Sequence, residues 1–214
     1  MHHPPPAMFL AEARGLDFLN SVATPLDTPF DWLADGAGFL DWLKQAGLAP
    51  ETVLADIAAR AMPGELDRVA DQARDLREWF RSFVRARMGR PLGAKALAEL
   101  KPLNRLLERD EAYGRIVVAH GHGGHAHLAF ESARRWRSPE SLLIPLGEAM
   151  AQVVVGEDFA QVKACEGERC TLVFADHTRG RARRWCSMAI CGNRAKQTDF
   201  RERRRAAAGP APGP

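Results

Sequence analysis

Four cysteines are the residues of this chain whose type and spacing most clearly indicate chemistry. Cys165, Cys170, Cys186 and Cys191 are the only cysteines among 214 residues, and they form two Cys-x4-Cys pairs separated by fifteen residues. Two close pairs across a short spacer suit one tetrahedral Zn²⁺ bound by four thiolates. Reduced thiols or an iron–sulfur cluster remain alternatives at this point, and His177 between the pairs could replace a ligand. A complete set of four thiolates leaves no position for a catalytic water, so we predict one structural zinc ion and no catalytic residues.

Four histidines near the middle of the chain are the second group that could bind a metal. They flank Gly123-Gly124, which suits a two-residue turn between strands 115–120 and 125–131. In that register Val117 faces Phe130 and Ala119 faces Leu128, which makes one side apolar. The other side then carries the histidines, which form a metal site, a pH-sensitive group or a plain polar surface: His120, His122, His125 and His127.

The charge of the chain is concentrated around the cysteines. Residues 160–214 hold twelve Lys and Arg against five Asp and Glu, a balance of +7, whereas the rest of the chain carries −4. A basic module of this kind attracts polyanions, and nucleic acid is the first expectation. A solvated, arginine-rich surface is the alternative.

The location of the protein bears on the state of its thiols. The start of the chain lacks the basic region and apolar stretch of a secretory signal, and no apolar run approaches the roughly 20 residues of a membrane span. We therefore expect a cytoplasmic protein without a membrane partner. Because cytoplasmic thiols are kept reduced, metal binding is favoured over disulfides.

The elements that would position the cysteines form a small hairpin followed by a helix. Strands 172–175 and 181–185 are expected around Thr178-Arg179-Gly180, and a basic helix from about Asn193 to Arg205. Trp185 and Phe200 are expected to pack around the metal. Helical spacing places Arg and Gln side chains on one face of this helix, where arginine can bind phosphate or guanine and glutamine can bind adenine. The predicted nucleic-acid contacts are Arg194, Lys196, Gln197, Arg201, Arg204 and Arg205 on the helix, and Arg179, Arg181, Arg183 and Arg184 on the hairpin.

The remainder of the chain is mainly helical. Apolar residues recur at helical spacing over 30–46, from Pro50 through Ile57, and over 65–88 and 94–108; a long helix is expected from 138 to about 163. The tryptophans of this part are expected in the core or an interface. The fold class is therefore α+β: a mainly helical N-terminal domain with a small β-hairpin, followed by a C-terminal zinc-ribbon or treble-clef-like module built on the four cysteines.

The string Arg183-Arg-Trp-Cys-Ser-Met-Ala-Ile-Cys-Gly-Asn-Arg194 resembles the signature of the CGNR zinc-finger family, and the preceding Phe174-Ala-Asp-His-Thr-Arg-Gly-Arg-Ala182 resembles its hairpin. The opening Gly15-Leu-Asp-Phe-Leu-Asn20-Ser-Val resembles the start of the ABATE domain that accompanies this finger. The resemblance implies that the four cysteines are zinc ligands and that the chain is a stress-induced transcription regulator. Asp17 and Asn20 match the family's opening and either line a pocket or serve as turn and capping residues.

These observations predict an ABATE-like sensing or interaction domain over 9–160, a CGNR-type finger over 161–206, and disordered ends at 1–8 and 207–214. The expected function is zinc-dependent DNA binding in transcription regulation, with a small-molecule effector as a further partner. A homodimer is compatible with this arrangement. The alternatives are an RNA- or protein-binding adaptor and an enzyme targeted by its finger. No glycine-rich phosphate loop, nucleophile elbow or paired-acid motif supports the enzyme.

Overall fold

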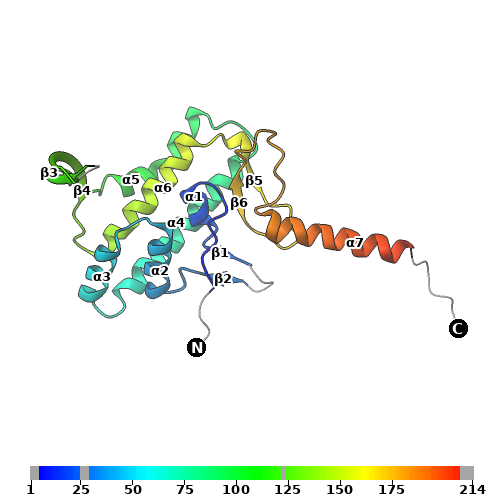
Figure 1. The fold of residues 1–214 in the computed structure, drawn as a ribbon, viewed down its shortest axis with the longest axis horizontal. Helices are drawn as coiled ribbons and strands as arrows, with labels where there is room; N and C mark the ends of the chain where they lie inside the picture. Colours follow the sequence, from blue (N-terminus) through cyan, green and yellow to red (C-terminus); the bar gives the residue numbers. More distant parts are fainter. Residues whose placement is uncertain (1–4, 25–28, 122–123, 208–214) are drawn as a thin grey trace.

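The computed structural model describes residues 5–24, 29–121 and 124–207, and for residues 205–207 it describes the backbone only. A helical body occupies one side of the molecule, and the last helix extends away from it (Figure 1). No helix within the described ranges is long and apolar enough to cross a membrane. The α-helices are α1 (Arg14–Leu19), α2 (Gly36–Ala46), α3 (Glu51–Arg60), α4 (Glu65–Arg87), α5 (Lys101–Leu107), α6 (Leu143–Gly156) and α7 (Asn193–Ala207). Shorter helical segments are η1 (Ala94–Leu100), η2 (Pro139–Leu142), η3 (Phe159–Gln161) and the π-helical η4 (Met188–Gly192).

The strands of the described chain form three separate antiparallel pairs. Their bounds are β1 (Val22–Ala23), β2 (Phe30–Asp31), β3 (Ala112–His120), β4 (Ala126–Arg134), β5 (Val162–Ala164) and β6 (Val173–Ala175). β1 pairs with β2, β3 with β4, and β5 with β6. The helices therefore supply the core, and the predicted α+β class with a mainly helical N-terminal domain is confirmed.

The short helix α1 lies in the middle of the molecule and packs against α4, α6 and β6 (Figure 1). Its first contact with α6 requires glycine, because a Cβ at Gly15 would overlap the carbonyl oxygen of Ala149. Leu16, Phe18 and Leu19 are completely buried around this contact. The α1 segment thus joins the helical body to the strands that follow it.

A buried ion pair connects α4 to the β1–β2 hairpin. The Arg77 side chain is only 3% exposed, and its guanidinium donates to both carboxylate oxygens of Asp31 at 2.7 Å and to the Ser21 hydroxyl at 3.0 Å. Burial alone would raise the pKa of Asp31, but the hydrogen bonds and charge of Arg77 together with the Leu33 N–H hold it below its ordinary value. The charge of Asp31 therefore contributes to the stability of the folded state.

We expect Asp31→Asn to lower the free energy of unfolding by about 3 kcal/mol at neutral pH, because it removes the charge of the carboxylate that binds both terminal nitrogens of the buried Arg77 guanidinium and leaves Glu78 at Nε as the remaining carboxylate partner. The unfolded carboxyl has a pKa of about 3.9, above that of the folded state, so the unfolded chain binds more protons between the two values. The stability difference between wild type and variant should be constant above about pH 5 and shrink as the pH falls through 4. Urea unfolding followed by tryptophan fluorescence measures it. The exposed Asp41→Asn should behave like wild type, and an equal loss in both variants would contradict the assignment.

Most of the predicted helical segments are present, but 94–108 is divided into η1 and α5, and two other helices differ at their ends. The helix expected over 30–46 begins only at Gly36, because Phe30–Asp31 pairs with β1 and the Asp35 carboxylate accepts the Gly38 N–H at 2.8 Å as an N-cap. The helix expected to reach about residue 163 ends at Gly156, and η3 and β5 follow it. Trp32 and Trp42 are buried in the core, whereas Trp79 and Trp136 are partly buried against it.

In the N-terminal segment residues 5–8 are ordered, whereas the sequence predicts disorder over residues 1–8. Within the expected disordered stretch, the Trp32 indole N–H donates to the Pro5 carbonyl at 2.6 Å, and the Ala7 N–H donates to Gln45 Oε1 at 3.0 Å. Residues 5–8 therefore contact the body of the protein. Residues 1–4 and 208–214, the rest of the expected disordered ends, lie outside the described residues, and residue 207 is the last of α7.

The β3–β4 hairpin exists, but its predicted register is wrong. Ile116 pairs with Phe130, Val118 with Leu128 and Ala119 with His127, one residue away from the expected pairs. The strands are joined through residues 121–125 instead of two residues, with Gly124 at a φ of +77°. A one-residue slip exchanges the two faces of a strand, so His120 and His127 lie on opposite faces and no metal-binding group forms among the described histidines. His122 lies outside the described residues.

Candidate metal centre and basic module

The four cysteine sulfurs converge at one point between β6, η4 and the loop after β5. All four Sγ atoms lie within 4.8 Å of one another. Cys186 Sγ is 3.8 Å from Cys170 Sγ and 3.6 Å from Cys191 Sγ. A tetrahedron of thiolates with zinc–sulfur bonds of about 2.3 Å has edges of about 3.8 Å, which matches these separations. The predicted ligands Cys165, Cys170, Cys186 and Cys191 therefore form one site that fits a single structural Zn²⁺.

The electrostatics of this cluster favour a cation at its centre. Hydrogen bonds from the thiols of Cys170 and Cys186, and from the backbone N–H groups of Cys186 and Gly167, lower the pKa of Cys165 to about 2. Cys165 in turn raises the pKa of Cys170 to about 12, Cys165 and Cys170 together raise that of Cys186, and burial raises the pKa of Cys191. One thiolate is thus stabilised by its neighbours, and further negative charge is opposed. A divalent ion supplies the charge that lets all four ionise.

Two glycines make room for the cluster. A Cβ at Gly167 would lie 2.9 Å from the sulfur of Cys191, and a Cβ at Gly192 would lie 2.7 Å from the Met188 sulfur. Neither residue has a positive φ, so neither glycine is needed for a left-handed turn. Their role is to leave space beside the metal ligands.

The elements that hold the cysteines differ in part from the prediction. β6 pairs with β5, and the Cys165–Cys170 loop lies at the turn of that hairpin, where the Cys165 N–H donates to the Leu172 carbonyl at 2.9 Å. Residues 181–185, expected as the second strand, form no ladder with β6. Cys191 lies in η4, which leads directly into α7. The basic helix after Cys191 is therefore confirmed, whereas the hairpin was assigned to the wrong pair of segments.

Asp176 binds the segment 181–185, for which the sequence predicts a strand. This fully buried carboxylate accepts Lys163 Nζ at 2.7 Å, the Thr178 hydroxyl at 2.6 Å and the Arg183 N–H at 2.9 Å. Burial raises the pKa of Asp176, but these hydrogen bonds more than compensate and hold it below its ordinary value. The Asp176 side chain thus holds this segment in place, whereas in a hairpin the backbone hydrogen bonds between two strands would do so. The spacing of Asp176 and Thr178, which suits an aspartate-centred turn, is the sequence signal that could have identified it.

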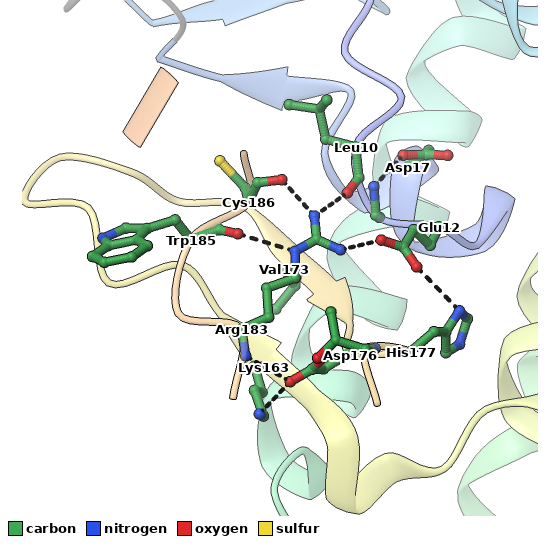
Figure 2. Close-up of polar contacts among 12 residues, drawn as sticks. Leu10, Glu12, Asp17, Lys163, Val173, Asp176, His177, Arg183, Trp185 and Cys186 are labelled. Carbon is green, nitrogen blue, oxygen red and sulfur yellow. Dashed lines mark hydrogen bonds and ion pairs between the residues drawn. The ribbon is translucent and has the colours of Figure 1, made fainter. Parts of the chain in front are cut away.

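Arg183 occupies the junction between the finger and the N-terminal segment (Figure 2). Its guanidinium donates to the Trp185 carbonyl at 3.0 Å and the Leu10 carbonyl at 2.8 Å, and it also bonds the Cys186 carbonyl and the Glu12 carboxylate. It lies over the Phe174 ring at 4.2 Å, and its side chain is 16% exposed. The sequence predicts that Arg183 contacts nucleic acid. In the structure its guanidinium N–H groups are bound to acceptors within the protein.

Further contacts join the same two parts of the chain. The Asn20 side chain binds the backbone of β6 in both directions, from Nδ2 to the Val173 carbonyl at 2.8 Å and from the Val173 N–H to Oδ1 at 3.0 Å. Glu12 and Glu157 both contact the His177 ring, at 3.3 Å and 2.7 Å, so His177 lies between two carboxylates and takes no part in the metal cluster. Asp17 is buried, which raises its pKa, and it accepts the Ala11 N–H at 3.0 Å. Asn20 and Asp17 therefore both bind backbone, Asn20 across a long sequence separation, and Asp17 also lines a cavity at this junction.

The other predicted nucleic-acid residues fall into three groups. On the loop, Arg179 is exposed, Arg181 bonds the Asp176 carbonyl, and Arg184 pairs with Glu166 at 2.6 Å while remaining 60% exposed. On α7, the exposed residues are Arg194, Lys196, Gln197, Arg201 and Arg204. The side chain of Arg205 lies outside the described part of the chain.

The two aromatic residues expected around the metal have different positions. Trp185 is partly buried and packs near Gly192, within the module. Phe200 is 60% exposed on α7, so its predicted place beside the zinc is wrong. The helix leaves the module before it reaches Phe200.

Comparison with known families agrees with this arrangement. The family model ABATE, described as "Putative stress-induced transcription regulator", matches residues 12–157. The CGNR zinc-finger model matches residues 161–204 and includes all four cysteines. A search of curated proteins gave no match. Neither matched family is a family of enzymes. The chain therefore belongs to the ABATE family and carries a C-terminal CGNR zinc finger.

Proposed function

We propose that this protein is a DNA-binding transcription regulator in which the zinc ion positions α7 for contact with a duplex. The observation that carries the proposal is the exposure of α7. From Asn193 to Arg204 only Ala195 is partly buried, and every other residue is exposed. Helical stability in proteins comes mostly from packing, so a helix without a buried face needs another partner to contact. A binding surface is the physical role that this exposure supports.

The charge of α7 indicates a polyanion as that partner. Its fifteen residues hold six Lys and Arg against two acids. Because the helix projects away from the body, about 22 Å of it is accessible to a groove (Figure 1). A major groove of about 12 Å admits a helix of this kind, and arginine forks bind phosphate and the guanine edge. Arg194, Gln197, Arg201 and Arg204 share the face on which we place these contacts.

The loop beside α7 supplies further contacts to the phosphate backbone. Arg179 and Arg184 are exposed there, and the Arg184 guanidinium lies 5.0 Å from the Trp185 ring, which orients it. Arg181 bonds the Asp176 carbonyl within the loop, and its positive charge adds to the attraction for phosphate. We leave Arg183 out of this surface because its guanidinium is bound to four acceptors inside the protein. The proposed role of these arginines is to fix orientation, while the α7 side chains read the bases.

The N-terminal domain is proposed to sense a small molecule. A cavity of about 470 Å³ lies where this domain meets the finger, and its lining comes from both. Arg183, Cys186 and Ser187 line it on the finger side, opposite Glu12 and Asp17. A ligand bound there would contact the backbone next to a zinc ligand. Through the zinc site it would affect the position of α7. The response to stress that the family description names would enter through this cavity.

The test is a selection of duplexes from a random-sequence pool with zinc-loaded protein, followed by binding measured by fluorescence anisotropy at increasing salt. Arg201→Ala combined with Arg204→Ala should weaken binding at least about tenfold and reduce the slope of log K against log salt by about 2, since each phosphate contact contributes about 0.9. Lys95→Ala combined with Lys101→Ala removes the same charge from exposed positions in η1 and α5 and should leave the slope unchanged.

The results also separate the alternatives. Tighter binding of a selected RNA than of any duplex would replace DNA with RNA as the partner. Absence of salt-dependent binding to either nucleic acid would instead favour a protein-binding adaptor. Equal losses in the α7 variant and its control would show that net charge, and not the α7 face, drives binding.

A further inference from the structure

The β3–β4 hairpin exposes an apolar face at the end of the molecule opposite α7 (Figure 1). Four large side chains point to this face, and we call them the apolar hairpin face: Ile116, Val118, Leu128 and Phe130. They are 71%, 58%, 74% and 78% exposed. The register places Ile116 directly beside Phe130 and Val118 directly beside Leu128, so the four form one continuous patch.

The face of this hairpin that carries its large aliphatic side chains and Phe130 is the more exposed of the two. Side chains of its other face are partly buried, among them Tyr113, Val117, Ala129 and Glu131, whereas every position from Gly114 to His120 on the apolar side is exposed. An antiparallel sheet ordinarily covers its apolar face and solvates the polar one. An isolated two-stranded hairpin is also marginally stable in water. The apolar hairpin face is therefore a surface that lacks its cover within the described chain.

The face is prearranged for contact. A Cβ at Gly114 would overlap Cζ of Phe130, so the Phe130 ring lies flat across the opposite strand. Its orientation is thus set by its own hairpin before any partner arrives. Aromatic residues held in this way are typical centres of protein interfaces.

The charge pattern favours a second copy of this chain as the partner. From Gly114↔Ser132 to His120↔Ala126 this face carries no Asp, Glu, Lys or Arg. Arg134, at its base, is turned to Asp110 and Glu148. Under a two-fold axis the same surface meets itself, so a neutral apolar surface faces no like charges and matches its copy. A partner of different composition would be expected to meet complementary charges, and the face offers none.

The size of the face agrees with a weak, specific dimer. At the exposures given above, the four side chains leave roughly 500 Å² of apolar surface in water, near the upper end for a monomer. Two copies would bury about 1,000 Å² together, which reaches the lower limit of specific interfaces.

We propose that the apolar hairpin face is a homodimer interface, with the β3–β4 hairpins of two copies packed face to face around Phe130 and Leu128. The hairpin lies far from α7, so this dimer leaves both zinc fingers accessible (Figure 1). We expect a weak dimer, with a dissociation constant on the order of 10 μM. The proposal is independent of DNA binding, because it concerns the opposite end of the molecule.

Sedimentation velocity of the zinc-loaded full chain from about 1 to 200 μM tests it. Wild type should change from monomer to dimer across this range. Leu128→Glu combined with Phe130→Glu should remain monomeric, since it places four carboxylates in one interface. Val155→Glu makes the same change at another exposed apolar position, 84% exposed, and should dimerise like wild type. Zinc content and circular dichroism report whether each variant is folded.

Val118→Thr serves as a second variant because it keeps the shape and the strand preference of valine. It should raise the dissociation constant about tenfold without affecting the fold. A wild type that stays monomeric throughout overturns the proposal. A dimer that survives in the double glutamate variant, or that Val155→Glu disrupts equally, overturns it as well, because the contact would then lie elsewhere.

Discussion

Cys186→Ser will abolish stoichiometric zinc binding and unfold the finger from β5 to the start of α7. Cys186 is 2% exposed, its sulfur lies between those of Cys170 and Cys191, and its N–H donates to Cys165 Sγ at 3.2 Å. β5 and β6 contain three residues each and cannot hold the module by themselves. A structural zinc ion contributes on the order of 10 kcal/mol to the folding of such a module. Loss of one thiolate therefore removes most of the stability of this region.

Zinc content per chain and limited proteolysis measure the result. Wild type should hold one zinc ion and resist cleavage within 165–192, whereas the variant should hold close to none and be cleaved there. Thr171→Ala changes an exposed residue next to Cys170 and should leave both measurements unchanged. A Cys186→Ser protein with a full zinc ion and an uncut finger would contradict the four-thiolate assignment.

Arg183→Ala will destabilise the whole chain, although the residue lies in a run of basic residues that we expected to contact nucleic acid. Its removal takes a donor from the carbonyls of Leu10 and Cys186 and removes the guanidinium that pairs with Glu12. Loss of these charge-assisted hydrogen bonds costs about 3 kcal/mol. Because these bonds join the N-terminal segment to the finger, urea unfolding of the zinc-saturated chain should begin at a lower denaturant concentration. Residues 5–12 should also become sensitive to protease.

Two further variants distinguish the charge of Arg183 from the geometry of its guanidinium, and its buried position from that of an exposed arginine. Arg183→Lys keeps the charge but cannot reproduce the planar fork, so it should lose most of the same stability. Arg179→Ala removes an exposed charge and should leave stability unchanged while weakening DNA binding. If Arg183→Lys were as stable as wild type, charge alone would account for the role of Arg183. If Arg179→Ala were equally destabilised, the distinction between the two arginines would be lost.

Hydrogen bonds at this junction join the region matched by the ABATE model to the zinc finger. Asn20 binds both backbone groups of Val173, and the Ala175 N–H donates to the Ala11 carbonyl at 3.0 Å. Segments separated by more than 150 residues thus share one set of hydrogen bonds. A change in the position of α1 or residues 10–12 would therefore reach β6 and the zinc ligands next to it.

Local patterns identified the longer helices, but they missed α1 and the strand pairings. The periodicity over 65–88 predicts α4 almost to the residue, because an amphipathic helix of that length depends mainly on nearby residues. The β3–β4 register depended on the length of the connection, and Gly123-Gly124 suggested two residues where the strands are joined through five. The partner of β6 was missed as well, because the sequence pattern places residues 162–163 at the end of a helix. A buried aspartate, Asp176, binds the backbone of residues 181–185 in place of a strand ladder.

The sequence by itself indicated the metal and its ligands, because two close cysteine pairs coincide with a string that resembles the CGNR zinc-finger signature. It also determined that positive charge gathers around them. Only the tertiary structure decided which arginines remain on the surface. Arg183 and Arg184 are adjacent and chemically identical, yet one is committed to carbonyls contributed by residues 10 and 186 and the other is exposed. That difference arises from chain segments brought together by folding, which no local spacing encodes.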